Sequence, residues 1–408
     1  MTGDITKQNK KKKIRAVRRH RIMARIISFI IAPFIYGIFK FKPERFSIKN
    51  KPAVVLSNHN ADLDAAFIYL SCSEHLYFVA SSHIIRWRFL GKLIEYVFDP
   101  IMRRKGTTEA RTAMEVLRTL RAGNSVCIFA EGNRSFNGET GMILPSTGKL
   151  VKKSGASLIT YRLHGGYFST PRWGKKMRRG GIFGKVVREY SPEEIAAMTD
   201  DEVNALIKND LYVNAYADQK ELSLRYKGKN KAEHLETTLY LCPVCGGCGT
   251  IHSSGDRAFC GCGLSMRYTE QGLLVADGSI ALPYSEILDW DHWQRERLPH
   301  LVGIAKDDET LIFVDERQIL CSINSNNELT QSTEGRFSMF RNRFEFTEND
   351  GETTVIPFVQ IDDVDTIGRL NLSFLLDDGN LIEIHSAVPR SPVKYRDGFR
   401  FLTGKQMG

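Results

Sequence analysis

The sequence predicts an α/β fold for the first half of the chain and a β-rich fold for the second half. Short apolar runs alternate with helical stretches between residues 53 and 190, and apolar residues recur with period two after residue 268. Alternating strands and helices are typical of a mostly parallel sheet flanked by helices. At 408 residues, the chain is long enough for two or three domains.

Five apolar runs are predicted to be strands of the first sheet: residues 53–56, 77–80, 97–102, 126–130 and 157–163. Residues 108–121 have helical spacing, and Gly123 follows them where a helix usually ends. Ligands of open α/β sheets bind at the carboxyl ends of the strands. Polar residues directly after a strand are therefore the first candidates for a site.

The first predicted strand is followed at residues 57–64 by Ser-Asn-His-Asn-Ala-Asp-Leu-Asp. The imidazole of His59 can take a proton from a hydroxyl near neutral pH, and the carboxylate of Asp64 can hold the ring in the required tautomer. His59 and Asp64 are therefore predicted to be a catalytic pair. A structural pair is the alternative, because this spacing also arises by chance.

A second block, residues 126–135, reads Val-Cys-Ile-Phe-Ala-Glu-Gly-Asn-Arg-Ser. His-x4-Asp followed about seventy residues later by Phe-x-Glu-Gly-x-Arg-Ser resembles the lysophosphatidic acid acyltransferase family, also called 1-acyl-glycerol-3-phosphate acyltransferases. The resemblance covers about residues 25 to 190. It implies that a fatty acyl group passes from acyl-CoA or acyl carrier protein to the free hydroxyl of a lysophospholipid. The implied acceptor is lysophosphatidic acid and the product is phosphatidic acid.

The same resemblance implies roles for single residues. His59 would be the general base, oriented by Asp64, and no covalent acyl-enzyme is required. The residues implied to hold the glycerol and phosphate of the acceptor are Glu131, Gly132 and Arg134. A strand-end Arg between the two blocks would also grip the phosphate, and Arg103 or Arg104 matches it, with Arg103 favoured.

Two positions depart from the family pattern. Ala130 stands before Glu131 where Pro is usual, and Thr160 takes the Pro place of a later block. Both changes reshape the wall of the acceptor pocket without removing a reacting group. The loop 164–179 mixes aromatic and basic residues, which suits lipid headgroups and also single-stranded nucleic acid.

The charge of the chain is divided between its halves. Residues 1–190 carry 36 Lys and Arg against 12 Asp and Glu, whereas residues 191–408 carry 21 against 35. A basic first half suits phosphorylated ligands and anionic lipid surfaces, with nucleic acid as the general competitor.

Residues 1–45 are predicted to be a basic, amphipathic membrane-anchoring segment. A run of Lys and Arg precedes the apolar stretch 26–39, which Pro33 interrupts and which is shorter than the ~20 residues needed to span a bilayer. A peripheral or monotopic anchor on the cytoplasmic face of the membrane is expected. A buried helix with a solvated basic tail is the alternative, and no small-residue site for signal-peptide cleavage follows.

Five of the eight cysteines fall between residues 242 and 262, which argues against a disulfide framework and for a reducing compartment. Two pairs of cysteines, each followed by a glycine, predict a structural zinc ribbon. Four thiolate ligands would leave no open position on the metal for chemistry. The expected ligands are Cys242, Cys245, Cys260 and Cys262. Because the second pair is Cys-x-Cys, Cys248 or His252 is an alternative ligand, and a group of reduced thiols is the alternative to a metal site.

The C-terminal part is predicted to form antiparallel hairpins in a small sandwich or barrel. Its period-two runs are residues 311–314, 337–340, 343–346, 354–356 and 372–376. The pattern faintly resembles a pleckstrin-homology-like barrel. Its acidic charge argues against a phosphoinositide site, so a packing or protein-interaction role is expected.

Helix start signals at Pro192 and at the capping box Thr199–Glu202 predict a helical connector. The predicted domains are an anchor (1–45), an acyltransferase domain (46–190), the connector (191–235), a zinc ribbon (236–270) and a β-rich domain (271–408). Expected partners are a membrane surface, the lysophospholipid acceptor and acyl-CoA or acyl carrier protein, without nucleic acid. The alternatives are an acyltransferase or transacylase acting on another lysolipid, and a non-catalytic zinc-ribbon protein that binds nucleic acid or membranes.

Overall fold

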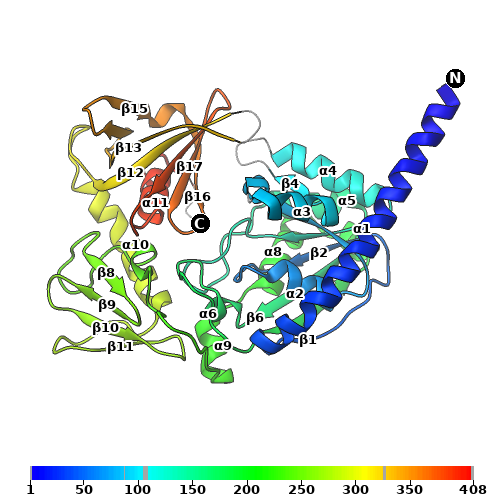
Figure 1. The fold of residues 1–408 in the computed structure, drawn as a ribbon, viewed down its shortest axis with the longest axis horizontal. Coiled ribbons are helices and arrows are strands. Elements are labelled where there is room, and N and C mark those ends of the chain that lie inside the picture. The colour runs from blue at the N-terminus through cyan, green and yellow to red at the C-terminus, as the bar shows by residue number, and fades with distance from the viewer. Residues whose placement is uncertain (1, 87, 104–108, 325–327, 406–408) are drawn as a thin grey trace.

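The computed structural model describes residues 2–86, 88–103, 109–324 and 328–405. Within these residues a seven-stranded, mostly parallel sheet is followed by a four-stranded antiparallel sheet and by a seven-stranded antiparallel sheet (Figure 1). The predicted fold class, an α/β domain followed by β-rich parts, is confirmed.

The first sheet has the strand order β1-β7-β6-β2-β5-β3-β4. Its strands are β1 (Lys42–Pro43), β2 (Ala53–Ser57), β3 (Leu76–Ser81), β4 (Ile101–Arg103), β5 (Ser125–Phe129), β6 (Ser157–His164) and β7 (Phe183–Tyr190). β2 lies between β5 and β6 and is parallel to both, with Ser57 opposite Phe129. The carboxyl ends of β2 and β5, which precede the two motifs, are therefore side by side.

Helices cover both faces of this sheet. One face carries α1 (Thr2–Phe39), α2 (Asp64–Ser71) and α3 (Arg88–Phe98), and the other carries α4 (Glu109–Arg121), α5 (Ser146–Ser154), α7 (Pro192–Ala197) and α8 (Asp200–Leu211). The side chains of β2 alternate between the two cores, with Val55 in the first and Val54 and Leu56 in the second. α7 and α8 begin at complete capping boxes, and both pack on the sheet.

One predicted strand is wrong. Residues 97 and 98 end α3, and only Ile101–Arg103 form a strand. Val97 is buried from the helical side, and Asp99 reverses the chain at φ 44°. A short apolar run has the same appearance in a buried strand and in the apolar face of a helix, so periodicity could not separate them.

α1 continues through Pro33, so the predicted interruption there is wrong. Residues 18–39 of this helix are long and apolar enough to cross a membrane by length and composition. Ala24, Ile35 and Phe39 are nevertheless buried against the first domain. The N-terminal end of α1 projects away from the rest of the molecule (Figure 1).

The second sheet consists of β8 (Ile251–Ser254), β9 (Arg257–Cys260), β10 (Ser265–Tyr268) and β11 (Leu274–Ala276). It is followed by α10 (Ile287–Gly303), a helix in a region where only strands were predicted. Trp290 of α10 packs in the core of the cysteine-containing sheet, whereas Leu298 and Val302 pack in the core of the last sheet. α10 therefore connects the two β units.

The last sheet has the order β15-β14-β13-β12-β18-β17-β16. Its strands are β12 (Phe313–Ile323), β13 (Leu329–Met339), β14 (Arg343–Glu348), β15 (Thr353–Pro357), β16 (Ile361–Ile367), β17 (Asn371–Leu376) and β18 (Leu381–Ser386). α11 (Val393–Leu402) packs Tyr395 and Phe399 against it. β16 and β18 lie outside the predicted runs.

The aromatic and basic loop 164–179 does not present its large groups to a ligand. Trp173 is fully buried, and the guanidinium of the buried Arg178 lies over the rings of Trp173 and Tyr268. The expectation of a headgroup-binding loop is therefore wrong for these residues. Arg stacked on aromatic rings also suits a buried contact between domains, which is its role here.

Glu383 of β18 links the last sheet to the first domain. Its buried carboxylate accepts hydrogen bonds from His83 Nε2 (2.9 Å), Arg86 Nη1 (2.8 Å) and His385 Nε2 (2.7 Å). Burial raises the pKa of Glu383, but the hydrogen bonds from His385 and His83 outweigh burial and hold it well below its usual range. Burial lowers the pKa of His385, whereas its contacts with Cys321 and Glu383 raise it to about 9.

Glu383→Gln is expected to lower the melting temperature most between about pH 5 and 6.5. The contribution of ionised Glu383 is lost in acid, as pH falls through its lowered pKa. The contribution of protonated His385 is complete below its ordinary pKa and is lost as pH rises through about 9. Thermal unfolding by circular dichroism measures the difference, with exposed Glu352→Gln as the control. An equal decrease in melting temperature at all pH values would contradict this prediction.

Candidate active site

His59 and Asp64 form a hydrogen-bonded pair at the carboxyl end of β2. His59 Nδ1 lies 2.8 Å from Asp64 Oδ2, and the same oxygen accepts the backbone N–H groups of Asn60 (2.7 Å) and Ala61 (2.8 Å). Asp64 is fully buried at the start of α2. Because the carboxylate is fixed by backbone donors, it can accept a hydrogen bond from Nδ1–H, which leaves Nε2 without a proton.

A stacking contact on one face of the ring also holds the imidazole of His59 in place. The ring of Phe129, the last residue of β5, stacks on His59 with centroids 4.3 Å apart and an interplanar angle of 19°. A ring fixed by both a hydrogen bond and a stacking contact has little rotational freedom. Such preorganisation favours proton transfer at a defined place.

Glu131 ties the two motifs together. Its Oε1 accepts the backbone N–H of His59 and its Oε2 accepts the backbone N–H of Gly141, each at 2.6 Å. Burial raises the pKa of Glu131 to about 8, while the two backbone donors act in the opposite direction. The structure therefore places this side chain as a bridge beneath the site.

Two cationic side chains flank the motif turns. Arg134 Nη2 lies 2.8 Å from Asp62 Oδ1, and its Nη1 donates to the carbonyl of Thr170. Arg103, at the end of β4, lies against Gly132, where an added Cβ would be 2.5 Å from Arg103 Nη1. Gly132 has φ 69°, so the backbone of this turn favours glycine, whereas the flexible Arg103 side chain could shift to admit a Cβ. Arg104 lies outside the described residues.

A cavity of about 870 Å³, open to solvent, lies next to His59. Its wall is mainly apolar and includes Phe78, Met114, Ile128 and Leu150. A polar pocket of about 430 Å³ adjoins it, and Arg103 and Arg134 line both spaces. The arrangement can hold an apolar chain on one side of the imidazole and an anionic group near the cations.

The last sheet also reaches the site, which sequence reasoning missed. Asn133 Nδ2 donates to both carboxylate oxygens of Asp365 (2.9 and 3.0 Å). Arg172 donates to the carbonyls of Arg134 (3.0 Å) and Gly368 (2.8 Å). Asn133 and Asp365 are 232 residues apart in the sequence and Arg172 and Gly368 are 196 apart, and no local pattern marks such contacts.

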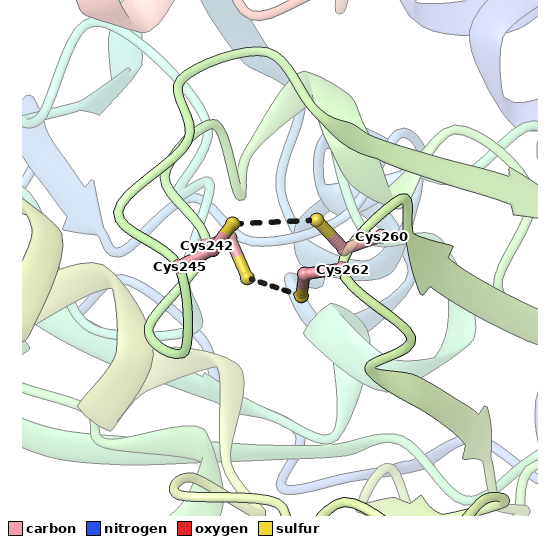
Figure 2. A group of neighbouring side chains, drawn as sticks. All are labelled: Cys242, Cys245, Cys260 and Cys262. Atoms are coloured by element: carbon pink, nitrogen blue, oxygen red, sulfur yellow. Dashed lines mark hydrogen bonds between the residues drawn. The ribbon is translucent and has the colours of Figure 1, made fainter.

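Figure 2 shows the second candidate site, the four thiols of Cys242, Cys245, Cys260 and Cys262. The four sulfurs lie within 4.8 Å of one another, and two pairs are 3.8 Å apart. Sulfur ligands 2.3 Å from a tetrahedral ion are separated by about 3.8 Å, so the cluster has suitable dimensions for a metal ion. The alternative ligands Cys248 and His252 lie outside this group.

The geometry predicts the tautomer of the active-site imidazole. In its neutral form, His59 is expected to carry its proton on Nδ1, because Asp64 accepts a hydrogen bond there. Two-bond ¹H–¹⁵N correlation spectra of labelled protein would report this, with His59→Gln assigning the signals by their loss. A neutral ring protonated on Nε2 would contradict the expected role of Asp64.

Comparisons with known proteins match the part of the chain that contains these residues. Residues 39–164, which contain both motifs, match the Acyltransferase family model. The probable 1-acyl-sn-glycerol-3-phosphate acyltransferase of Mycoplasma genitalium is 24% identical over 205 residues, 49% of this chain and 73% of that protein.

Two solved structures show weaker similarity. The 1-acyl-sn-glycerophosphate (LPA) acyltransferase PlsC from Thermotoga maritima has a TM-score of 0.37 at 19% identity, covering 47% of this chain and 78% of that one. The C-terminal domain of an unknown protein from Leishmania infantum has a TM-score of 0.15 at 14% identity, covering 24% and 83%. The family match at residues 39–164 and the curated relative identify this chain as an acyltransferase enzyme.

Proposed function

We propose that the protein transfers a fatty acyl group from acyl-CoA or acyl carrier protein to the free hydroxyl of lysophosphatidic acid and so forms phosphatidic acid. The observation that carries this proposal is the His59–Asp64 pair beside an apolar cavity, with Arg103 and Arg134 at the same opening. The name of the Mycoplasma genitalium relative supports the choice of acceptor.

The reaction needs one base and no covalent enzyme intermediate. The Asp64 carboxylate accepts a hydrogen bond from Nδ1–H, so Nε2 of His59 takes the proton of the acceptor hydroxyl as its oxygen attacks the thioester carbonyl. A C–O bond forms, the C–S bond breaks, and the imidazolium returns its proton to the departing thiolate. The negative charge of Asp64 stabilises the imidazolium formed on the way.

The apolar cavity and the polar pocket would hold different parts of the substrates, the acyl chain and the phosphate. Burial of an acyl chain in the apolar cavity stabilises the complex by about 0.8 kcal/mol per methylene. A phosphate near Arg103 and Arg134 would replace the Asp62 carboxylate as a partner of Arg134, since guanidinium forks suit both anions. Glu131 and Gly132 would act on the acceptor indirectly, by fixing the motif turns.

The same proposal places the protein on a membrane. Exposed apolar side chains recur along one side of α1 at Ile22, Ile26, Phe29, Ile30 and Phe34, while the opposite side is buried in the protein. A helix buried on one side and apolar on the other suits a position in the membrane interface better than a free span. Attachment to the cytoplasmic face as a peripheral or monotopic protein follows from the basic charge of this half.

Loss of the base should lower turnover. His59→Ala is expected to lower kcat by at least about 10²-fold, because general-base assistance is worth ~10² to 10⁴. Asp64→Asn should cost a similar factor by removing the charge beside the imidazolium. Initial rates with acyl-CoA and lysophosphatidic acid measure this. His164→Asn is a matched control, because His164 forms a comparable pair with Asp218 (2.6 Å) on another element. Near-normal turnover of His59→Ala would refute the assignment.

Loss of the cations should act on acceptor binding. Arg103→Ala and Arg134→Ala are expected to raise the acceptor KM more than they lower kcat, because a phosphate contact exists in ground and transition states alike. The effect should shrink with an acceptor that lacks the phosphate. Arg118→Ala, on the exposed side of α4, is the control. Equal losses with both acceptors would exclude a phosphate role.

We also propose that the cysteine cluster holds a structural zinc ion, for which a closed set of four thiolates is typical. Elemental analysis of purified protein should give about one zinc per chain. Cys260→Ser should lose the metal and destabilise the second sheet, whereas Cys248→Ser should keep it. Fully folded, metal-free protein would contradict the proposal.

A further inference from the structure

We propose that the hairpin of β16 and β17 supplies a wall of the acyl-chain cavity through Ile367, and that this residue helps to select acyl-chain length. The inference rests on the proposed function and extends it to a C-terminal part that the family match at residues 39–164 does not include. β16 and β17 lie on the side of the last sheet that faces the first domain (Figure 1).

The alternation of β16 directs two residues toward the first domain. Val364 is fully buried in the core of the last sheet, so strand alternation places Asp365 and Ile367 on its other side, while the hydroxyl of the buried Thr366 bonds Arg172. Asp365 there bonds the motif residue Asn133, and Ile367 lines the same cavity as His59. Gly368, at φ 58°, turns the chain directly afterwards.

The hairpin is fastened to the catalytic motif. Arg172 donates to the carbonyls of Gly368 (2.8 Å) and Thr366 (3.0 Å), to the hydroxyl of Thr366 (2.7 Å) and to the carbonyl of Arg134 (3.0 Å). Its guanidinium also lies 4.1 Å from the centroid of Phe136. One buried side chain thus holds the motif turn and the hairpin at a fixed separation, which makes the hairpin a firm wall.

The chemistry of the wall indicates which part of the substrate it meets. Ile367 shares the cavity with apolar side chains of the first domain, including Phe78, Met114 and Ile128. An apolar wall of this kind suits a hydrocarbon chain. Each methylene that can no longer enter the cavity should cost about 4-fold in binding.

The first test compares chain lengths. Ile367→Trp should lower kcat/KM for long acyl-CoA relative to short acyl-CoA by about 10-fold or more, the equivalent of two methylenes, with little change for the shortest donor. Ile367→Ala should shift the preference toward longer acyl chains. This variant provides the test if Ile367→Trp fails to fold. Val359→Trp, at an 89% exposed position in the 3₁₀ helix Phe358–Gln360 between β15 and β16, is the size-matched control. Unchanged chain-length profiles in both Ile367 variants would overturn the inference while the proposed function stands.

The second test does not depend on turnover. Acyl-CoA brominated along its chain should quench the fluorescence added by I367W and should leave that added by V359W unquenched. If the wild-type protein transferred no acyl group at all, the proposed function would fail, and quenching alone would decide whether the hairpin contacts an acyl chain. Equal quenching in both variants, or none in either, would overturn the inference.

Discussion

The hydrogen bonds of Glu131 are the contact on which the active site depends. One carboxylate joins the backbone of His59, after β2, to that of Gly141, beyond β5. The parallel pairing of β2 with β5 makes this possible, because it places both strand ends at one edge of the sheet. The imidazole then lies between its carboxylate and the ring of Phe129. Without Glu131, these two backbone N–H groups would lose their acceptor. Their hydrogen bonds offset the free-energy cost of burying the Glu131 carboxylate and also fix the geometry of the two turns.

Local chemistry explains which parts of the structure could be predicted. The apolar runs of β2 and β5 and the polar residues after them follow from strand burial and from the position of ligand sites in parallel sheets. Pro192 at the first helical position marked α7, and the capping box Thr199–Glu202 marked α8, because both signals act within one helical turn. The cysteine spacing predicted the cluster because close thiols need no long-range information.

Features that depend on distant partners could not be predicted. Residues 97–98 belong to a helix, but their apolar side chains would look the same in a strand. Trp173 stacks on Arg178 in a buried contact and does not face a lipid. The hydrogen bonds of Asn133 to Asp365 and of Arg172 to Gly368 join parts of the chain with no shared pattern. α10 packs into two different cores, and the polar residues Asp291 and Gln294 interrupt the apolar residues on its buried side. The C-terminal sheet was expected to have a packing or protein-interaction role, yet it also lines the cavity beside His59.

The most direct test of the central claim is the fate of a labelled acyl chain. Purified protein would be incubated with acyl-CoA carrying a ¹³C-labelled chain and with lysophosphatidic acid. The lipids, the free CoA and the protein would then be analysed by mass spectrometry. Direct transfer assisted by His59 predicts one labelled phosphatidic acid for each CoA released and no label on the protein. Release of CoA without labelled lipid, or label held on the protein, would contradict the account.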